Sequence, residues 1–240
     1  MILIEKVNTG KGNQKGGKEL MLMDVISAIE GRKSIRAFKS NPVPKEMIKK
    51  VLQSAIQAPS SSNQQPWRFI VVAGREKDRL GERLLTAYKE KTLKYDPSRG
   101  KSIPQEYVEK TRRLFKDIRP YIQETGQQTK NFVEEGSFQF YHAPVAILIT
   151  MDKCFPRSRL MDIGLAAENL MLSAHALGLG TCALALILTC EDIMREELNL
   201  PQDQELVLGI ALGYPDTASP LYQFKSSRDE LEKMVIWKGF

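Results

Sequence analysis

The chain has 240 residues, of which 42% are apolar and 27% are charged, and its formal net charge is +6. This composition is sufficient for a globular domain with a full core and excludes a chain that is disordered throughout. No apolar run reaches the roughly 18 residues that a membrane helix requires, and no secretory signal is recognisable at the N-terminus. We therefore expect a cytoplasmic protein without a membrane span.

The cysteines and histidines give little support to metal or disulfide chemistry. The three cysteines, Cys154, Cys182 and Cys190, are odd in number and lack the spacing of a zinc site. The two histidines, His142 and His175, lie apart from them in the sequence. We interpret the thiols as reduced and buried and the histidines as packed, and we expect no bound metal.

The positive charge is concentrated in residues 75–130, which hold 15 lysines and arginines against 9 acidic residues. Nucleic acid is one partner for such a segment, but charges of opposite sign are interleaved and no nucleic-acid-binding motif is present. A solvated helical face is the favoured interpretation. A face that attracts acidic small molecules or an anionic cofactor is the alternative.

In chain order, the first predicted elements are a polar leader and two helices. Residues 1–20 are rich in glycine and polar residues, and we expect a flexible leader there. Apolar residues at helical spacing predict one helix that ends near Gly31 and a second that begins after Pro44 and ends at Pro59.

Residues 32–38, between these helices, read Arg-Lys-Ser-Ile-Arg-Ala-Phe and gather two guanidinium groups, an amine and a hydroxyl. A phosphate presents oxygens that match an arginine fork, and each charge-assisted hydrogen bond contributes about 1.5 to 3 kcal/mol when it is shielded from water. The segment therefore fits phosphate binding. A solvated basic turn after a helix is the alternative.

Residues 58–69 form a second distinctive segment, Ala-Pro-Ser-Ser-Ser-Asn-Gln-Gln-Pro-Trp-Arg-Phe, which leads into an apolar strand over residues 69–73. Pro59 and Pro66 exclude helix, so the backbone donors between them lack regular partners and are available to a planar polar ligand. An ordinary loop before a strand is the alternative. Together with residues 32–38, this loop suggests a bound flavin.

The rest of the chain alternates between helical and extended patterns. Residues 75–141 form a helical excursion, and the aromatic residues Phe138, Phe140 and Tyr141 at its end are candidates either for the core or for the wall of a substrate pocket. The predicted elements from the excursion onward are helices around residues 78–94, 104–121, 158–177 and 191–198, and strands over residues 144–151 and 205–215.

The order, spacing and types of these residues resemble the FMN-dependent nitroreductase superfamily. The resemblance rests on Arg-x-Ser-x-Arg-x-Phe and on Ala-Pro-Ser-Ser-x-Asn-x-Gln-Pro-Trp-x-Phe, and it covers roughly the first third of the chain, with shorter similar segments at residues 178–182 and 213–215. It implies an α/β (α+β) fold over residues 21–240, a three-layer sandwich of a mixed central sheet flanked by helices. It further implies a homodimer in which a strand near residues 234–237 joins the sheet of the partner.

The resemblance also implies a set of FMN contacts. Arg32, Lys33 and Ser34 match residues that hold the phosphate and the ribityl chain, and Arg36 matches the residue beside the pyrimidine end of the isoalloxazine. A fixed cation at that edge stabilises the reduced flavin. Arg228 matches an arginine that closes on the phosphate. The expected cofactor-binding residues also include Ser60, Ser61 and Asn63, partly contributed by the other subunit, and the segment of Ala183, Leu184 and Ala185, whose backbone amides approach flavin N5.

Two positions depart from the family pattern. Residues 183–186 are Ala-Leu-Ala-Leu, where many relatives carry an acidic residue or paired glycines, and this leaves the choice between NADH and NADPH open. Ser226 stands where the family has a lysine, so the sequence leaves open whether Lys225 takes its role.

The activity implied by the resemblance is a ping-pong oxidoreductase reaction. NADH or NADPH reduces the flavin and leaves, and a nitroaromatic, a quinone or a related small acceptor is then reduced. We expect no catalytic carboxylate or histidine. Other reactions of the same scaffold are dehalogenation, ene reduction and flavin cleavage. A flavin-binding carrier or sensor without turnover is an alternative of another class.

Overall fold

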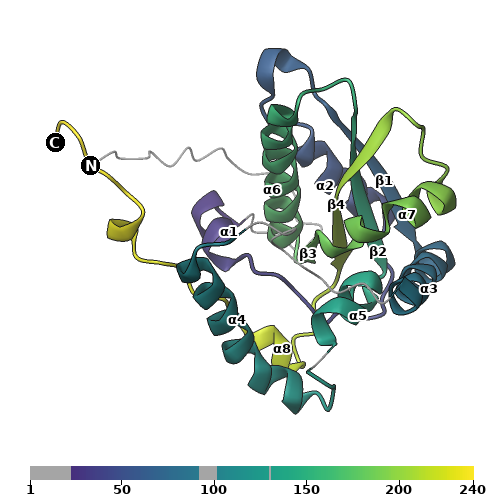
Figure 1. Ribbon diagram of the computed structural model, residues 1–240, viewed down its shortest axis with the longest axis horizontal. Coiled ribbons are helices and arrows are strands. Elements are labelled where there is room, and N and C mark those ends of the chain that lie inside the picture. The colour runs from purple at the N-terminus through teal and green to yellow at the C-terminus, as the bar shows by residue number, and fades with distance from the viewer. Residues whose placement is uncertain (1–22, 92–101, 130) are drawn as a thin grey trace, which may run out of the picture.

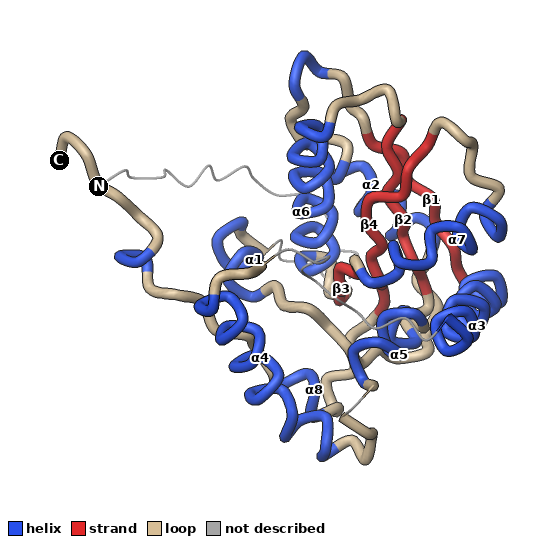
Figure 2. Tube along the Cα trace, viewed as in Figure 1, coloured by secondary structure: helices blue, strands red, loops and turns tan. Residues whose placement is uncertain are grey.

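The computed structural model describes residues 23–91, 102–129 and 131–240. The expected leader at residues 1–20 lies outside the described residues, as do the last residues of the helix expected around residues 78–94. Within them, a sheet carries helices on both of its faces, which is the expected α+β sandwich (Figures 1 and 2).

The described sheet has four strands in the order β1-β2-β4-β3, and every neighbouring pair is antiparallel. The strands are β1 (Trp67–Ala73), β2 (Val145–Asp152), β3 (Gly180–Leu184) and β4 (Gln204–Gly213). A parallel bridge joins Ser34 to Thr181 at the edge of the sheet, and the N–H of Ile35 donates to the oxygen of Thr181 at 2.9 Å. Parallel pairing among the described residues is therefore confined to this bridge, which ties the Arg-Lys-Ser segment to β3.

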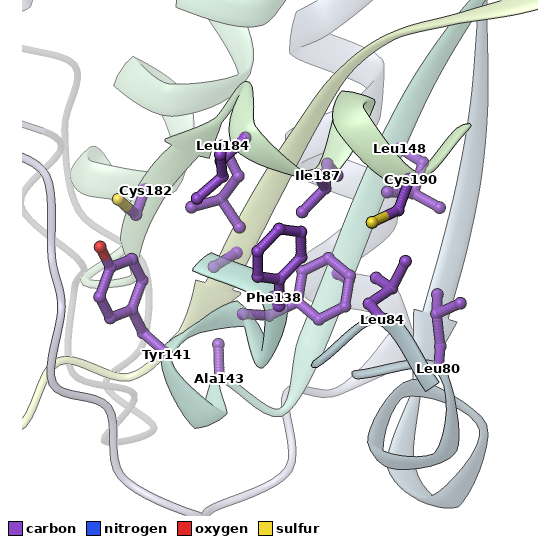
Figure 3. Packing of buried hydrophobic residues seen from close by; sticks show 14 of the residues in the cluster. Leu80, Leu84, Phe138, Tyr141, Ala143, Leu148, Cys182, Leu184, Ile187 and Cys190 are labelled. Atoms are coloured by element: carbon purple, nitrogen blue, oxygen red, sulfur yellow. The ribbon is translucent and has the colours of Figure 1, made fainter. Parts of the chain in front are cut away.

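Strand β2 lies in the middle of the fold, as its continuous apolar sequence predicts. Ala146 and Leu148 face a core cluster on one side of the sheet, whereas Ile147 and Ile149 face a second cluster on the other side. Burial of each branched side chain contributes about 1.5 to 3 kcal/mol, so this strand is a main source of stability. Figure 3 shows part of the first cluster.

The helices divide between the two faces of the sheet (Figure 2). Helices α2 and α6 cover the second cluster, whereas α3, α5 and α7 cover the first, and α4 packs against α8 beside them. No described helix is both long and apolar enough to cross a membrane. The helices are α1 (Val25–Gly31), α2 (Lys45–Ala55), α3 (Gly74–Lys91), α4 (Gln105–Glu124), α5 (Phe132–Phe138), α6 (Leu160–Ala176), α7 (Glu191–Leu198) and α8 (Pro220–Gln223).

Two features differ from the sequence interpretation. The segment around Cys182, for which the sequence patterns predict no strand, is strand β3, because its backbone pairs with β4. Phe138 and Phe140 are fully buried and belong to the core, which excludes them from a pocket wall. Residues 234–240 form no strand within this chain and extend away from the fold (Figure 1), and their pairing with the sheet of a partner stays a prediction.

Candidate functional site

The Arg-Lys-Ser segment borders a cavity of about 180 Å³ at the edge of the sheet. Arg32 and Lys33 line it from the end of α1, His175 lines it from the end of α6, and Gly178 and Gly180 contribute where the chain enters β3. Gly180 is required here, because a Cβ atom at this position would lie 2.7 Å from Cγ1 of Ile35. The missing side chain lets residues 34–35 lie directly against β3.

Two of the cations at this cavity are held in different ways. The Nε atom of Arg32 lies 3.5 Å from Oε1 of Glu168 on α6. The ammonium of Lys33 donates to the backbone oxygen of Tyr222 and lies 4.1 Å from the centroid of its ring. The tyrosine therefore orients the ammonium of Lys33 but supplies no negative charge.

Lys225 reaches the same place from the C-terminal part of the chain. Its Nζ atom donates to the backbone oxygen of Glu30 at 2.7 Å. The pKa of Lys33 is lowered mainly by burial and, to a smaller extent, by the positive charge of Lys225. Within the described chain neither lysine has a carboxylate at ion-pair distance. The cluster of Arg32, Lys33 and Lys225 thus carries more positive than negative charge and favours an anion such as a phosphate.

Arg36 borders a second cavity, of about 340 Å³, whose other lining residues lie in segments 127–128 and 131–142. Its Nε atom is buried and has no hydrogen-bond partner. Burial opposes the charge of Arg36, but Cys182 and Tyr141 outweigh it and raise the pKa of the guanidinium. A buried donor without a partner costs about 1 to 3 kcal/mol, so this guanidinium is suited to a polar ligand in the cavity.

The polar loop before β1 is anchored by a buried carboxylate. The backbone N–H of Ser61 donates to Oδ2 of Asp162 at 3.3 Å, and the same oxygen accepts from Nη1 of Arg159 at 3.3 Å. Ser60 accepts the N–H of Gln65 at 3.0 Å. The loop therefore keeps a defined shape although Ser61 is exposed to solvent.

This loop lies at the opposite end of α6 from the cation cluster. Asp162 is in the first turn of the helix and His175 in the last, and a rise of 1.5 Å per residue separates them by about 20 Å. One chain therefore does not bring Ser60, Ser61 and Asn63 to the cavity that Arg32 lines. Asn63 also has a φ of 53°, a left-handed conformation that asparagine tolerates better than most residues.

The remaining expected contacts lie at the edge of the sheet and in a third cavity. Ala183 and Ala185 are exposed and Leu184 is buried, so the side chains of this segment alternate between solvent and core. Arg228 lines a separate cavity of about 390 Å³ beside α4, and its Nη1 atom donates to Oγ of Ser226 at 2.9 Å. Its contact with a phosphate stays a prediction, whereas Lys225 stands beside Lys33.

Sequence reasoning named Tyr141 as a candidate for the core or for a pocket wall, but it did not identify His175 and Asp162 as residues of this region. An acidic residue in the first turn of an apolar helix was the only local signal for Asp162. The sequence around His175 does not indicate its role, because the residues that it meets in space come from another segment of the chain. A Cβ atom at Gly31, for example, would lie 2.6 Å from Nε2 of His175.

The fold is an α+β sandwich with a cationic cavity at its sheet edge and, further along the same segment, a guanidinium whose Nε atom has no partner. These features suit a phosphorylated polar ligand. Residues 29–214 match the model of the Nitroreductase family, which is well over half of the chain. The chain belongs to the nitroreductase family.

Individual relatives agree with this assignment. The chloronitrobenzene nitroreductase of Comamonas testosteroni is 34% identical over 218 residues, which cover 87% of this chain and 94% of that protein. The nitrobenzene nitroreductase of Ectopseudomonas oleovorans is 33% identical over 215 residues, with the same coverage of 87% and 94%. The structure of the FMN-dependent nitroreductase NfnB from Mycobacterium smegmatis in complex with NADPH is 28% identical, with a TM-score of 0.76 over 89% of this chain and 97% of that one.

Proposed function

We propose that this protein is an FMN-dependent NAD(P)H oxidoreductase that reduces nitroaromatic compounds, with quinones and related small oxidised molecules as further acceptors. One observation carries the proposal: the segment from Arg32 to Arg36, tied to β3, has excess positive charge at one end and a buried guanidinium with an unpartnered Nε atom at the other. This spacing, about 13 Å in an extended chain, suits a ligand with a phosphate at one end and a polar ring at the other.

The residues present fit FMN. Bound FMN supplies the two-electron chemistry, whereas the protein supplies binding, orientation and electrostatics. Arg32, Lys33 and Lys225 would hold the phosphate, with Ser34 beside them. Arg36 would face the ring edge on which negative charge develops, where a preorganised cation stabilises the reduced form. The exposed backbone around Ala183 and the neighbouring residues of β3 would lie along the ring.

The proposal includes a homodimer with shared sites. Ser60, Ser61 and Asn63 lie too far along α6 to serve the cavity of their own chain, so they would serve that of a second copy. Solvent-exposed apolar side chains support such an interface, since Ile236 and Trp237 are 84% and 64% exposed. Further exposed apolar residues lie on α1 and α6, namely Val25, Ile26, Ile29, Met161 and Leu165.

The electron donor and the acceptor follow from the relatives. NfnB of Mycobacterium smegmatis was solved with NADPH, and the two bacterial enzymes above are named for nitrobenzene and chloronitrobenzene. We propose the same classes of donor and acceptor for this chain, and the cytoplasm, which supplies reduced nicotinamide nucleotides, as its compartment. Neither nucleic acid nor a membrane is a proposed partner.

The test is spectroscopic and kinetic. The purified protein, incubated with FMN and desalted, should retain the visible absorption of a flavin, and anaerobic NADPH or NADH should bleach it. Nitrobenzene, a chloronitrobenzene or benzoquinone should then restore the oxidised spectrum. A protein that retains no FMN contradicts the proposal. Bound FMN that neither nucleotide reduces would identify a carrier or sensor instead.

A further inference from the structure

Tyr141 lies in a left-handed turn that the surrounding structure must hold in place. Phe140, Tyr141 and His142 have φ values of 53°, 49° and 57°, and none of the three is glycine. Consecutive left-handed residues are unfavourable for L-amino acids and are found mainly where other contacts determine the conformation, often at functional sites.

The turn fixes the ring of Tyr141 from two sides. Phe140 is fully buried in the core and anchors the turn. On the other side, a Cβ atom at Gly136 of α5 would lie only 2.3 Å from Cε1 of Tyr141, so the ring lies directly on the backbone of the helix. The ring of Phe132 is a further neighbour, with a centroid separation of 5.7 Å. The tyrosine is 5% exposed and its side chain has little freedom.

The hydroxyl of Tyr141 meets the guanidinium of Arg36 at this place. Cζ of Arg36 lies 5.9 Å from the ring centroid of Tyr141. Arg36 and Ser137 are near enough to the hydroxyl to lower its pKa, although the larger effect of burial raises it. Figure 3 shows the hydroxyl pointing toward Cys182 on β3. Arg36 is therefore in contact with residues of η2 (Phe140–His142), of β3 and of its own segment, all of which also pack in the core.

The partners of Arg36 are neutral. Burial raises the pKa of Tyr141 and also that of Cys182, so the hydroxyl and the thiol both keep their protons at neutral pH. No carboxylate of the described chain lies at ion-pair distance from Arg36. Glu135 lines the same cavity but forms no ion pair with Arg36, so the positive charge of Arg36 remains available to a ligand. Nη1 of Arg36 donates to the backbone oxygen of Ser34 at 3.5 Å.

We propose that Tyr141 is a positioning residue of the cofactor site, whose hydroxyl holds the Arg36 guanidinium toward the ring of the bound flavin and thereby increases the stability of the reduced cofactor. This inference rests on the proposed function, since it requires that FMN binds beside Arg36. Tyr141 acts through Arg36 and need not touch the acceptor.

The experiment compares reduction potentials of FMN-loaded variants, measured at equilibrium against a reference dye. Tyr141→Phe keeps the ring and removes the hydroxyl, and we expect a roughly tenfold lower ratio of reduced to oxidised FMN at a fixed potential, equivalent to 29.6 mV for a two-electron couple. Tyr214→Phe is the matched control, because its hydroxyl lies 3.8 Å from Sδ of Met47 in the other core cluster. Its potential should equal that of the wild type.

A double-variant cycle separates positioning from a direct effect. In an Arg36→Met background, Tyr141→Phe should produce no further shift in potential, because the group that it positions is gone. A full shift in that background overturns the proposal, as does an unchanged potential in Tyr141→Phe itself. If Tyr141→Phe does not fold, Ser137→Ala removes a polar neighbour of the hydroxyl, and a potential equal to that of the wild type then overturns the proposal. Failure of the wild type to bind FMN contradicts the proposed function instead.

Discussion

The Nζ atom of Lys225 lies 2.7 Å from the backbone oxygen of Glu30, and this bond fixes a residue near the C-terminus beside the last turn of α1. The family pattern has a lysine at position 226, where this chain has Ser226. Lys225, one position earlier, carries a positive charge that is near enough to Lys33 to lower the pKa of its ammonium, after the larger effect of burial. Lys225 is the better candidate for the missing phosphate contact.

Lys225→Met should weaken FMN binding with little effect on folding. Loss of one charge-assisted hydrogen bond costs about 1.5 to 3 kcal/mol, which is roughly a 10- to 100-fold rise in the dissociation constant. The dissociation constant can be measured from the quenching of flavin fluorescence on binding. Lys50→Met, an exposed change on α2, is the control. An unchanged affinity for FMN would show that Lys225 does not contact the phosphate. A comparable loss of affinity in Arg228→Met would mean that the Arg228 side chain leaves Ser226 and reaches the phosphate.

Gly180→Ala should destabilise the fold and weaken FMN binding together. The new methyl would lie 2.7 Å from Cγ1 and 3.0 Å from Cβ of Ile35, an atom close to the backbone that cannot rotate away. Overpacking of this kind costs about 1 to 3 kcal/mol, and it moves the Arg-Lys-Ser segment away from β3. Urea unfolding gives the free energy. In an Ile35→Ala background, Gly180→Ala should reduce the free energy of unfolding by less than it does in the wild type. If the effects of the two substitutions simply add, the contact between residues 180 and 35 is not the cause of the destabilisation.

His175 should make stability depend on pH below neutrality. Burial, then Arg32 and Lys33, lower its pKa below the ordinary value of 6.5. The unfolded chain therefore binds a proton at a higher pH than the folded one does, and the free energy of unfolding should fall as pH decreases from about 6.5 toward the lowered pKa. His175→Gln should flatten this slope in urea titrations.

NMR can observe the same residue directly, because His142 is the only other histidine of the chain. Saturating FMN should raise the pKa of His175, since a phosphate offsets the charge of the neighbouring cations. A pKa at or above 6.5 in the protein without FMN would contradict the excess of positive charge in this cluster.

Local patterns predicted the elements that are long and regular, and missed those that depend on a distant partner. The continuous apolar run of β2 and the helical spacing in α2 and α6 are visible in a short window of sequence. Strand β3 has five residues of mixed character and exists because β4 pairs with it. The contact between Lys225 and Glu30 spans 195 positions, which no local pattern can reveal. The motif residues near Arg32 were recognisable by type, but their neighbours His175 and Tyr222 were not.

Removal of residues 234–240 should dissociate the proposed dimer. Four large apolar side chains of this segment are at least 61% exposed in their own chain, namely Met234, Ile236, Trp237 and Phe240. Analytical ultracentrifugation of the truncated protein should therefore show a larger monomer fraction at low micromolar concentration, together with weaker FMN retention. Lys238→Ser, which leaves the apolar side chains intact, should remain dimeric. A truncated protein that stays dimeric would place the interface elsewhere, with α1 and α6 as the remaining candidates.

Substitutions of Asp162 should separate the charge of this residue from its hydrogen bond to the loop. Asp162→Ala leaves the N–H of Ser61 and the guanidinium of Arg159 without their partner, and we expect a loss of about 3 kcal/mol in the free energy of unfolding. Asp162→Asn retains an oxygen that can accept from Ser61, so it should lose less, about 1 kcal/mol. Because Ser61 would serve the site of a partner subunit, Asp162→Ala should also weaken FMN binding more than Asp162→Asn does. Equal losses in the two variants would mean that the carboxylate acts only through its charge on Arg159.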